Sequence, residues 1–230
     1  MLNSNIDFFR TTDGGLIAHR TWAKSIFSDL LCRELPVVRK EDATEFVQST
    51  SKVPFRKNST CMQCHSSVDP LASTVRNIMN INDDSADSKA YFSPRGLWTF
   101  PVTKPPESRL EDEDKDFFHR PPKGVLYFRN YKGELVNRSV TGVGELGSEL
   151  AKTDDLYLCA AKRYFEFMTG IDVKMDDFSK SSAITGKSLE YRNFVIQLGL
   201  HLKDHQKLKQ MVREIVSSPY YSQSDYGASL

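Results

Sequence analysis

Apolar residues recur at helical spacing in several separate segments, which predicts a mainly α-helical protein. In the segment 18–35, Trp22, Ile26, Leu30 and Leu35 fall on one face. Two glycines precede this segment and a proline follows it, as is typical of helix boundaries. We therefore expect the first helix to span residues 18–35.

The segment 59–80 carries apolar residues at a similar spacing, and we expect much of it to be helical. Ser59 and Thr60 at its start are good capping residues. Pro70 lacks an N–H and disfavours helical geometry at Asp69, which predicts an interruption or bend there. The Asp69 carboxylate is expected to cap the next segment, with a catalytic role as the alternative.

One segment alternates between its two faces in the way that β-strands do. Residues 124–140 read GVLYFRNYKGELVNRSV, with a turn at 131–133, and they predict one small β-hairpin. The preceding residues 82–122 are rich in loop-forming residues and include the acidic run 111–116. We expect that run to be a solvated surface loop, with a cation or partner site as the alternative.

The C-terminal third again shows helical periodicity. We expect four helices there, in the segments 144–153, 154–170, 188–202 and 205–218. Gly170 is the expected stop of the second. The fold class is therefore mainly α, with one small β-hairpin and a C-terminal helical region.

Composition and charge narrow the function classes. The chain has 230 residues, 39% of them hydrophobic and 27% charged, with a net charge of +1. This balance indicates a water-soluble globular protein and favours neither a nucleic acid nor a lipid surface as partner. No apolar run reaches the roughly 18 residues that a membrane span needs.

The main chemical signal is Cys61-Met62-Gln63-Cys64-His65. It matches C-x-x-C-H, the signature of covalent haem c attachment. Two thiols three residues apart on one helical turn can reach the two vinyl groups at one edge of a porphyrin. The adjacent His65 can then serve as the proximal iron ligand.

Two other readings of these residues stay open. A zinc site needs a second ligand pair, but Cys32 and Cys159 are isolated, and His201 and His205 lack a clear third ligand. A redox dithiol of the thioredoxin type follows a strand in a βαβ unit, whereas a short, basic and polar segment precedes Cys61. Covalent haem is the favoured interpretation.

A low-spin electron carrier also needs a sixth iron ligand, whereas a site for O₂ or peroxide leaves that position open. The favoured candidates are Met168, near a helix end, and His119, in a loop. The ordinary alternatives are that Met168 fills a core and that His119 is simply solvated. Less favoured donors are Met79, Met175, His201, His205 and Met211.

Cys32 and Cys159 both lie on apolar stripes of expected helices. They are either two separate buried thiols or a disulfide that joins the N-terminal helix to the C-terminal helical region. The sequence leaves both possibilities open.

The stretch CMQCHSSVDPLA, residues 61–72, resembles the C-x-x-C-H-x-x-[ILV]-D-P-L-[AG] signature of the large cytochrome-c-containing proteins of planctomycetes, also found in proteobacteria. The segments 15–36, 133–172 and 208–221 resemble other parts of the C-terminal half of that family. Ile171 replaces the usual arginine, and the segment after Leu71 lacks the family's G-x-x-x-E-x-[FY]-D. The resemblance implies an exported, haem-bearing protein.

We therefore expect a monohaem c-type cytochrome segment for one-electron transfer in the bacterial cell envelope, with haem c and its iron as cofactor. Alternatives are an envelope module with a structural haem and a peroxidase-like enzyme with an open distal site. We expect a haem region in residues 1–110 and the hairpin with the helical region in 111–230. The expected location is periplasmic or otherwise exported. Because no signal peptide is visible, we expect the chain to be part of a larger polypeptide or complex, with an unidentified redox partner protein.

Overall fold

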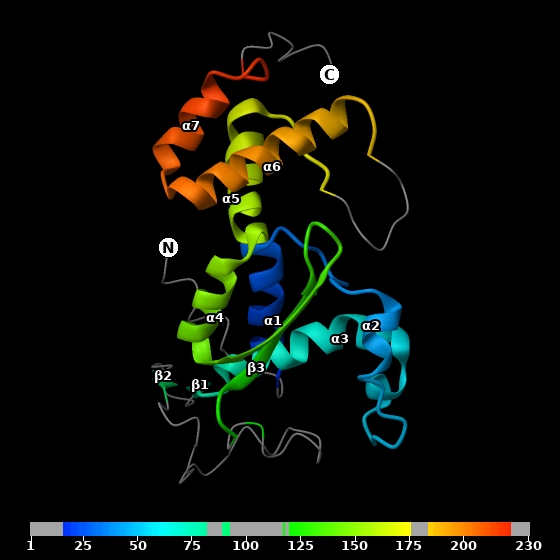
Figure 1. Cartoon of the computed structure of the whole chain (residues 1–230). Coiled ribbons are helices and arrows are strands. Elements are labelled where there is room, and N and C mark those ends of the chain that lie inside the picture. Colours follow the sequence, from blue (N-terminus) through cyan, green and yellow to red (C-terminus); the bar gives the residue numbers. More distant parts are fainter. Residues whose placement is uncertain (1–15, 82–88, 93–116, 118–119, 176–183, 222–230) are drawn as a thin grey trace. The chain divides into compact units, whose positions relative to one another are not determined.

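The chain is mainly α-helical, as the periodicity predicted (Figure 1). The structure is a computed structural model and describes residues 16–81, 89–92, 117, 120–175 and 184–221. The acidic run 111–116 lies outside this part of the chain. Among the described residues, no helix is long and apolar enough to cross a membrane.

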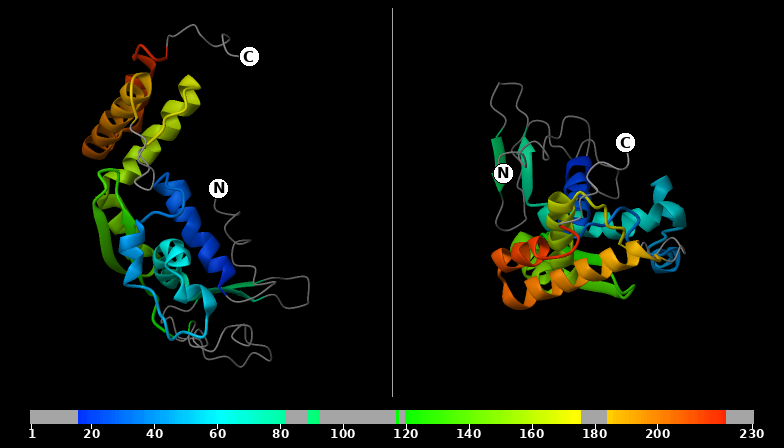
Figure 2. Two further views of the ribbon diagram at one scale, coloured as in Figure 1. Left: turned by 90° about the vertical axis from the view of Figure 1, so that its right-hand side faces the viewer. Right: turned by 90° about the horizontal axis from the view of Figure 1, so that it is seen from above.

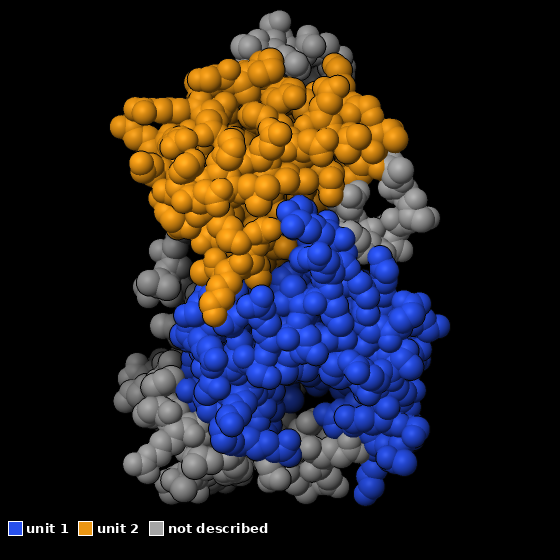
Figure 3. Space-filling model, in the orientation of Figure 1, with its two compact units in different colours: residues 1–28, 33–150 blue, residues 29–32, 151–230 orange. Residues whose placement is uncertain are grey.

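The chain forms two compact units (Figure 3). Unit 1 comprises residues 1–28 and 33–150, and unit 2 comprises residues 29–32 and 151–230. The expected boundary at residue 110 falls outside the described residues. The hairpin was expected in one region with the C-terminal helices, but it belongs to unit 1, where its first strand packs on the helix that carries Cys61.

Unit 1 is built around one helix, α3 (Ser59–Ala72), which packs against several of its other elements. These other elements include α1 (Ile17–Ser25), α2 (Lys40–Thr44), the 3₁₀ helix η4 (Pro54–Lys57), β3 (Lys123–Arg129), β4 (Leu135–Thr141) and α4 (Gly142–Lys152). Figure 2 shows α3 between α1 and the hairpin of β3 and β4. A helix enclosed in this way has little freedom to rotate about its axis.

The expected interruption of this helix at Pro70 is wrong. The helix runs through Pro70 to Ala72 and continues as a 3₁₀ turn, η5 (Ser73–Val75). Proline removes one backbone hydrogen bond, but Leu71 and Ala72 are fully buried beside it. The cap also differs from the expected Ser59 or Thr60, since the Asn58 side chain accepts a hydrogen bond from the Thr60 N–H at 2.8 Å.

Two other boundaries differ from the sequence expectation. The first helix ends at Ser25, and a π-helix, η3 (Ile26–Leu30), follows it. Cys32 has a left-handed backbone (φ 51°), which ends the helical run before residue 35. After η5 the chain forms β1 (Ile78–Ile81), which pairs antiparallel with β2 (Lys89–Phe92). This second two-stranded sheet replaces the expected end of the helix at residue 80.

The predicted hairpin is present, with β3 and β4 antiparallel and Leu126 opposite Arg138. Its first strand lies very close to α3 at Gly124. A Cβ at that position would come within 2.4 Å of the Pro70 carbonyl oxygen and 2.5 Å of Thr74 Cγ2. Only glycine permits this approach, so Gly124 sets how closely the sheet packs on the helix.

A second contact fixes the other end of the same strand. Arg129 donates from Nε and Nη2 to the two carboxylate oxygens of Asp42, at 2.7 and 2.6 Å. This pairing holds the pKa of Asp42 below its ordinary value. Tyr127 donates to the Asp42 carbonyl at 3.0 Å. These bonds join α2 to β3.

Unit 2 is a helical cluster made by α5 (Asp154–Thr169), α6 (Lys187–His205) and α7 (Leu208–Val216). Its first helix ends at Gly170 in the left-handed conformation (φ 70°), as expected. Its core consists of Ala161, Phe165, Val173, Val195, Leu198, Met211 and Ile215. Ile171, where the resembled family has arginine, packs against this core.

Within unit 2, Cys32 and Cys159 form a disulfide bond, with their Cα atoms 5.2 Å apart. This settles the alternative that the sequence left open. The bond closes a loop with a sequence separation of 127 residues. A loop of that length gives a stabilisation of about 4–5 kcal/mol in the chain-entropy account of disulfides.

Gly124→Ala should lower the free energy of unfolding by about 1–3 kcal/mol, because the added methyl group must push β3 away from α3. The matched control is Gly147→Ala in α4, where a Cβ would meet nothing within 4 Å. That change should be neutral, or stabilising by up to about 1 kcal/mol. Urea unfolding of both variants tests this, and equal stabilities would contradict the close packing.

Replacing Cys32 and Cys159 together by alanine should lower the free energy of unfolding by about 4–5 kcal/mol. Denaturant unfolding of this variant and of the oxidised protein measures the difference. Peptide mapping without reduction should also yield a linked pair that contains both residues. Full alkylation of both cysteines in unreduced, denatured protein would refute the bond.

Candidate functional site

The three residues of the C-x-x-C-H motif lie on one side of α3. At about 100° per residue, Cys61, Cys64 and His65 fall within about 100° of helical arc. All three are half-buried, and both thiols are free. On the same helix, Met62, Ser66 and other residues are buried in unit 1. The packing of the helix therefore leaves the motif at the surface of the unit.

His65 is held by a carboxylate one helical turn further along. Its Nδ1 lies 3.1 Å from both carboxylate oxygens of Asp69. Asp69 in turn accepts two hydrogen bonds from Arg20 of α1, from Nε at 2.7 Å and from Nη2 at 3.1 Å. The Asp69 carboxylate thus binds His65 and Arg20 instead of capping the next segment.

The electrostatics of this group favour an ionised carboxylate. Burial raises the pKa of Asp69, but the hydrogen bonds and charges of His65 and Arg20 outweigh it and hold the pKa below its ordinary value. The side chains of His65 and Asp69 are 27% and 25% exposed, so water screens their interaction less than at an open surface. An ionised Asp69 accepts a hydrogen bond from the Nδ1–H of His65, and in that tautomer Nε2 carries the lone pair that can bind a metal.

An aromatic ring also packs against one face of the imidazole. Phe55 of η4 stacks on His65 with ring centroids 4.0 Å apart and an angle of 24° between the planes. The Arg20 guanidinium carbon lies 5.4 Å from the centre of the same ring, within cation–π distance. Both the tilt and the rotation of the imidazole are therefore restrained.

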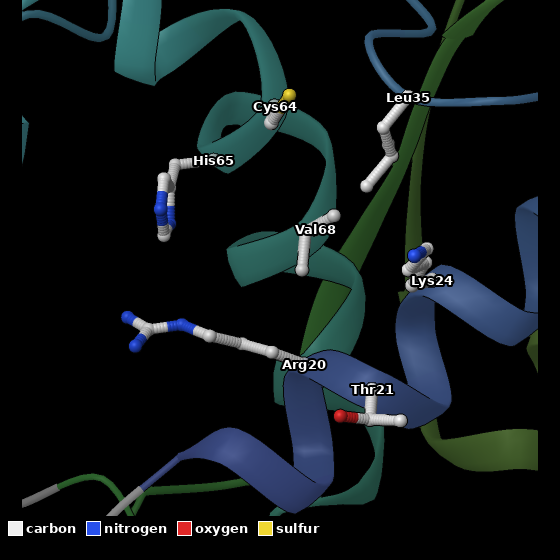
Figure 4. Close-up of a pocket in the computed structure, with 7 residues that line it drawn as sticks. All are labelled: Arg20, Thr21, Lys24, Leu35, Cys64, His65 and Val68. Carbon is white, nitrogen blue, oxygen red and sulfur yellow. The ribbon is translucent and has the colours of Figure 1, made fainter.

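A cavity of about 220 Å³ opens beside the motif. In Figure 4, the side chain of Arg20 extends from α1 toward His65, and Val68 lies between His65 and Leu35. The complete lining is Arg20, Thr21, Lys24, Leu35, Cys64, His65 and Val68. This volume is below the roughly 300–1,000 Å³ of pockets that enclose a small molecule. A group held by covalent bonds needs no such enclosure.

The donor set fits haem c. Attachment needs two free thiols one turn apart and an adjacent imidazole, and a hydrogen bond to Nδ1 commonly orients an imidazole that binds a metal. Cys61, Cys64 and His65 meet these requirements. The apolar side chains of Leu35 and Val68 supply a surface for a macrocycle.

Among the described residues, no three or more His, Cys, Asp or Glu side chains are grouped so that they could hold a metal ion. Two observations bear against the dithiol alternative. A 3₁₀ helix precedes the motif helix, where a thioredoxin-type dithiol has a strand. Burial, followed by the charge of Cys61, raises the pKa of Cys64, which is opposite to the activation of redox thiols.

Met168, one of the two favoured sixth-ligand candidates, belongs to unit 2, whereas His65 belongs to unit 1. Met168 lies on α5 and packs against the core of unit 2. His119 lies outside the described residues. Of the other donors, Met175 also packs against the unit 2 core, Met211 belongs to it, and His201 pairs with Glu214 at 3.2 Å. The choice of sixth ligand stays a prediction.

Sequence reasoning missed Arg20 and Phe55 as parts of the site, and it gave Asp69 a different role. The i, i+4 spacing of His65 and Asp69 was a usable signal, because such residues meet on a helix. No comparable signal marks Arg20 or Phe55, which reach the site from other elements.

Comparison with protein-family models, with curated proteins and with solved structures gives no match to this chain. The resemblance to the planctomycete-type cytochromes therefore rests on the sequence motifs alone.

The raised pKa of Cys64 predicts slow alkylation in the haem-free protein, because less thiolate is present at a given pH. In the Cys61→Ser variant, Cys64 is the one free thiol left. Iodoacetamide should modify it more slowly at pH 8 in the folded protein than in denaturant. Its rate should rise with an inflection above the ordinary thiol pKa. Faster reaction in the folded state would instead indicate an activated redox dithiol.

Proposed function

We propose that this chain is a monohaem c-type cytochrome segment that carries out one-electron transfer in the bacterial cell envelope. Cys61 and Cys64 hold the haem by thioether bonds, and His65 is the proximal iron ligand. Haem iron supplies one-electron exchange between its ferrous and ferric states. The observation that carries the proposal is the free thiol pair beside an imidazole whose Nδ1 is bound to Asp69.

The protein's own residues supply three further requirements of such a site. Asp69 and Phe55 orient the imidazole. Leu35 and Val68 exclude water from part of the adjacent surface. Because the cavity is open, one edge of the proposed haem stays accessible from outside. A redox partner can then approach that edge closely, and a short distance favours electron exchange. The redox partner is an unidentified protein of the same compartment.

An exported location is part of the proposal. Disulfide bonds persist in oxidising compartments and are rare in the cytosol of mesophiles. The bond between Cys32 and Cys159 therefore supports a periplasmic or otherwise exported protein. Haem c attachment takes place in the same kind of compartment.

A second candidate function is a peroxidase-like enzyme with an open distal site. The specific observation in its favour is the carboxylate at His65 Nδ1, since such a partner raises the basicity of a metal-bound imidazole. The alternative of a purely structural haem requires no such partner.

Covalent haem on residues 61–65 is tested by expression with the haem c maturation machinery. Each thiol adds across one vinyl group without a leaving group, so the intact mass should exceed that of the polypeptide by one complete haem. A pyridine haemochrome spectrum should identify haem c. Replacing Cys61 and Cys64 together by alanine should abolish the covalent pigment.

The matched control replaces the other two cysteines, Cys32 and Cys159, by alanine and should retain the pigment. A colourless wild-type protein that carries stoichiometric zinc would overturn the proposal. On the loaded protein, a reversible spectral change with dithionite and no CO binding support a carrier. Tight CO or cyanide binding supports the open site. Spectra of Met168→Ala and His119→Ala then test the two sixth-ligand candidates.

A further inference from the structure

The contacts of His65 continue beyond the motif into a defined chain of three side chains. The imidazole Nδ1 lies 3.1 Å from both oxygens of Asp69, and Arg20 binds the same two oxygens at 2.7 and 3.1 Å. The Asp69 carboxylate is thus shared between an iron-ligand candidate and a permanent positive charge. Neither Asp69 nor Arg20 belongs to the C-x-x-C-H motif.

Each member of this chain comes from an element whose position is fixed by packing. His65 and Asp69 are one turn apart on α3, and Arg20 lies on α1, which packs against α3. Phe55 contacts both ends, since it stacks on His65 at 4.0 Å and lies 5.4 Å from the Arg20 guanidinium carbon. The geometry therefore does not depend on a flexible surface side chain.

We propose that Asp69 and Arg20 together set the reduction potential of the iron bound by His65. Asp69 is the positioning residue that holds the Nδ1–H of the imidazole and increases its donation to iron. Arg20 limits this effect by drawing on the same carboxylate. The inference rests on the proposed function, and it assigns regulation of the potential to residues outside the haem motif.

The physical reasoning has two steps. A carboxylate hydrogen-bonded to Nδ1 increases the electron density of the imidazole ring and stabilises the ferric state relative to the ferrous state. The two hydrogen bonds from the Arg20 guanidinium compete for that density, because charge-assisted bidentate bonds are strong. The potential should therefore rise when Asp69 loses its charge and fall when Arg20 loses its charge.

Asp69→Asn is the first variant, because it removes the charge and keeps the shape of the side chain. At a fixed ambient potential, the ratio of ferric to ferrous protein should fall at least tenfold. For a one-electron couple this corresponds to an upward shift of about 59 mV or more. Spectroelectrochemical titration of the haem-loaded protein measures it.

Arg20→Gln is the second variant, and Lys24→Gln is its matched control. Lys24 lines the same cavity as Arg20, so its removal reports the effect of a lost positive charge alone. Arg20→Gln should lower the potential more than Lys24→Gln does. In an Asp69→Asn background the excess should disappear, because the carboxylate through which Arg20 acts is gone. Equal shifts in both backgrounds would overturn the role of Arg20.

The haem-free protein gives an independent readout. ¹⁵N NMR of the histidine side chains should show the neutral His65 with its proton on Nδ1, and Asp69→Asn should reduce that preference. A population with the proton on Nε2 in the wild type would overturn the inference. Failure of haem attachment overturns the proposed function as well. A loaded protein whose potential does not respond to Asp69→Asn overturns this inference alone.

Discussion

The close contact between α3 and β3 is the constraint on which the candidate site depends. At Gly124 the strand backbone approaches the Pro70 carbonyl more closely than any side chain would permit. The same helix is covered by α1 and α2 on other sides. Because burial fixes the rotation of α3, it also fixes which residues face outward. Cys61, Cys64 and His65 are on that side, and Asp69 follows one turn later.

The order of the interactions explains why the imidazole is well oriented before any metal binds. Packing sets α3 against α1, which brings Arg20 within 2.7 Å of Asp69. The ionised carboxylate then binds His65 at Nδ1, and Phe55 stacks on one face of the imidazole ring. Ordering a side chain costs conformational entropy. In this site the imidazole is already ordered by the fold, so binding of a metal does not have to offset that loss of entropy.

Much of the fold and part of the site could be predicted from the sequence. The helices of unit 2, the stop at Gly170 and the hairpin followed from periodicity and turn residues. The continuation of α3 through Pro70 did not, because burial of Leu71 and Ala72 outweighs a local preference. Arg20 and Phe55 could not be assigned to the site either. Their contacts depend on how separate elements pack, and a single sequence carries no direct signal of that.

The four cysteines form two pairs in different chemical states, one a disulfide and one a pair of free thiols. This difference bears on the proposed function. Cys32 and Cys159 form a disulfide bond, and such bonds persist mainly in oxidising compartments. Cys61 and Cys64 are free, although they lie one turn apart on α3 and next to His65. In such a compartment a neighbouring thiol pair tends to oxidise unless another reaction consumes it. The proposed thioether formation consumes both thiols without oxidation, so under the proposed function a disulfide pair and a haem-binding thiol pair are compatible within one compartment.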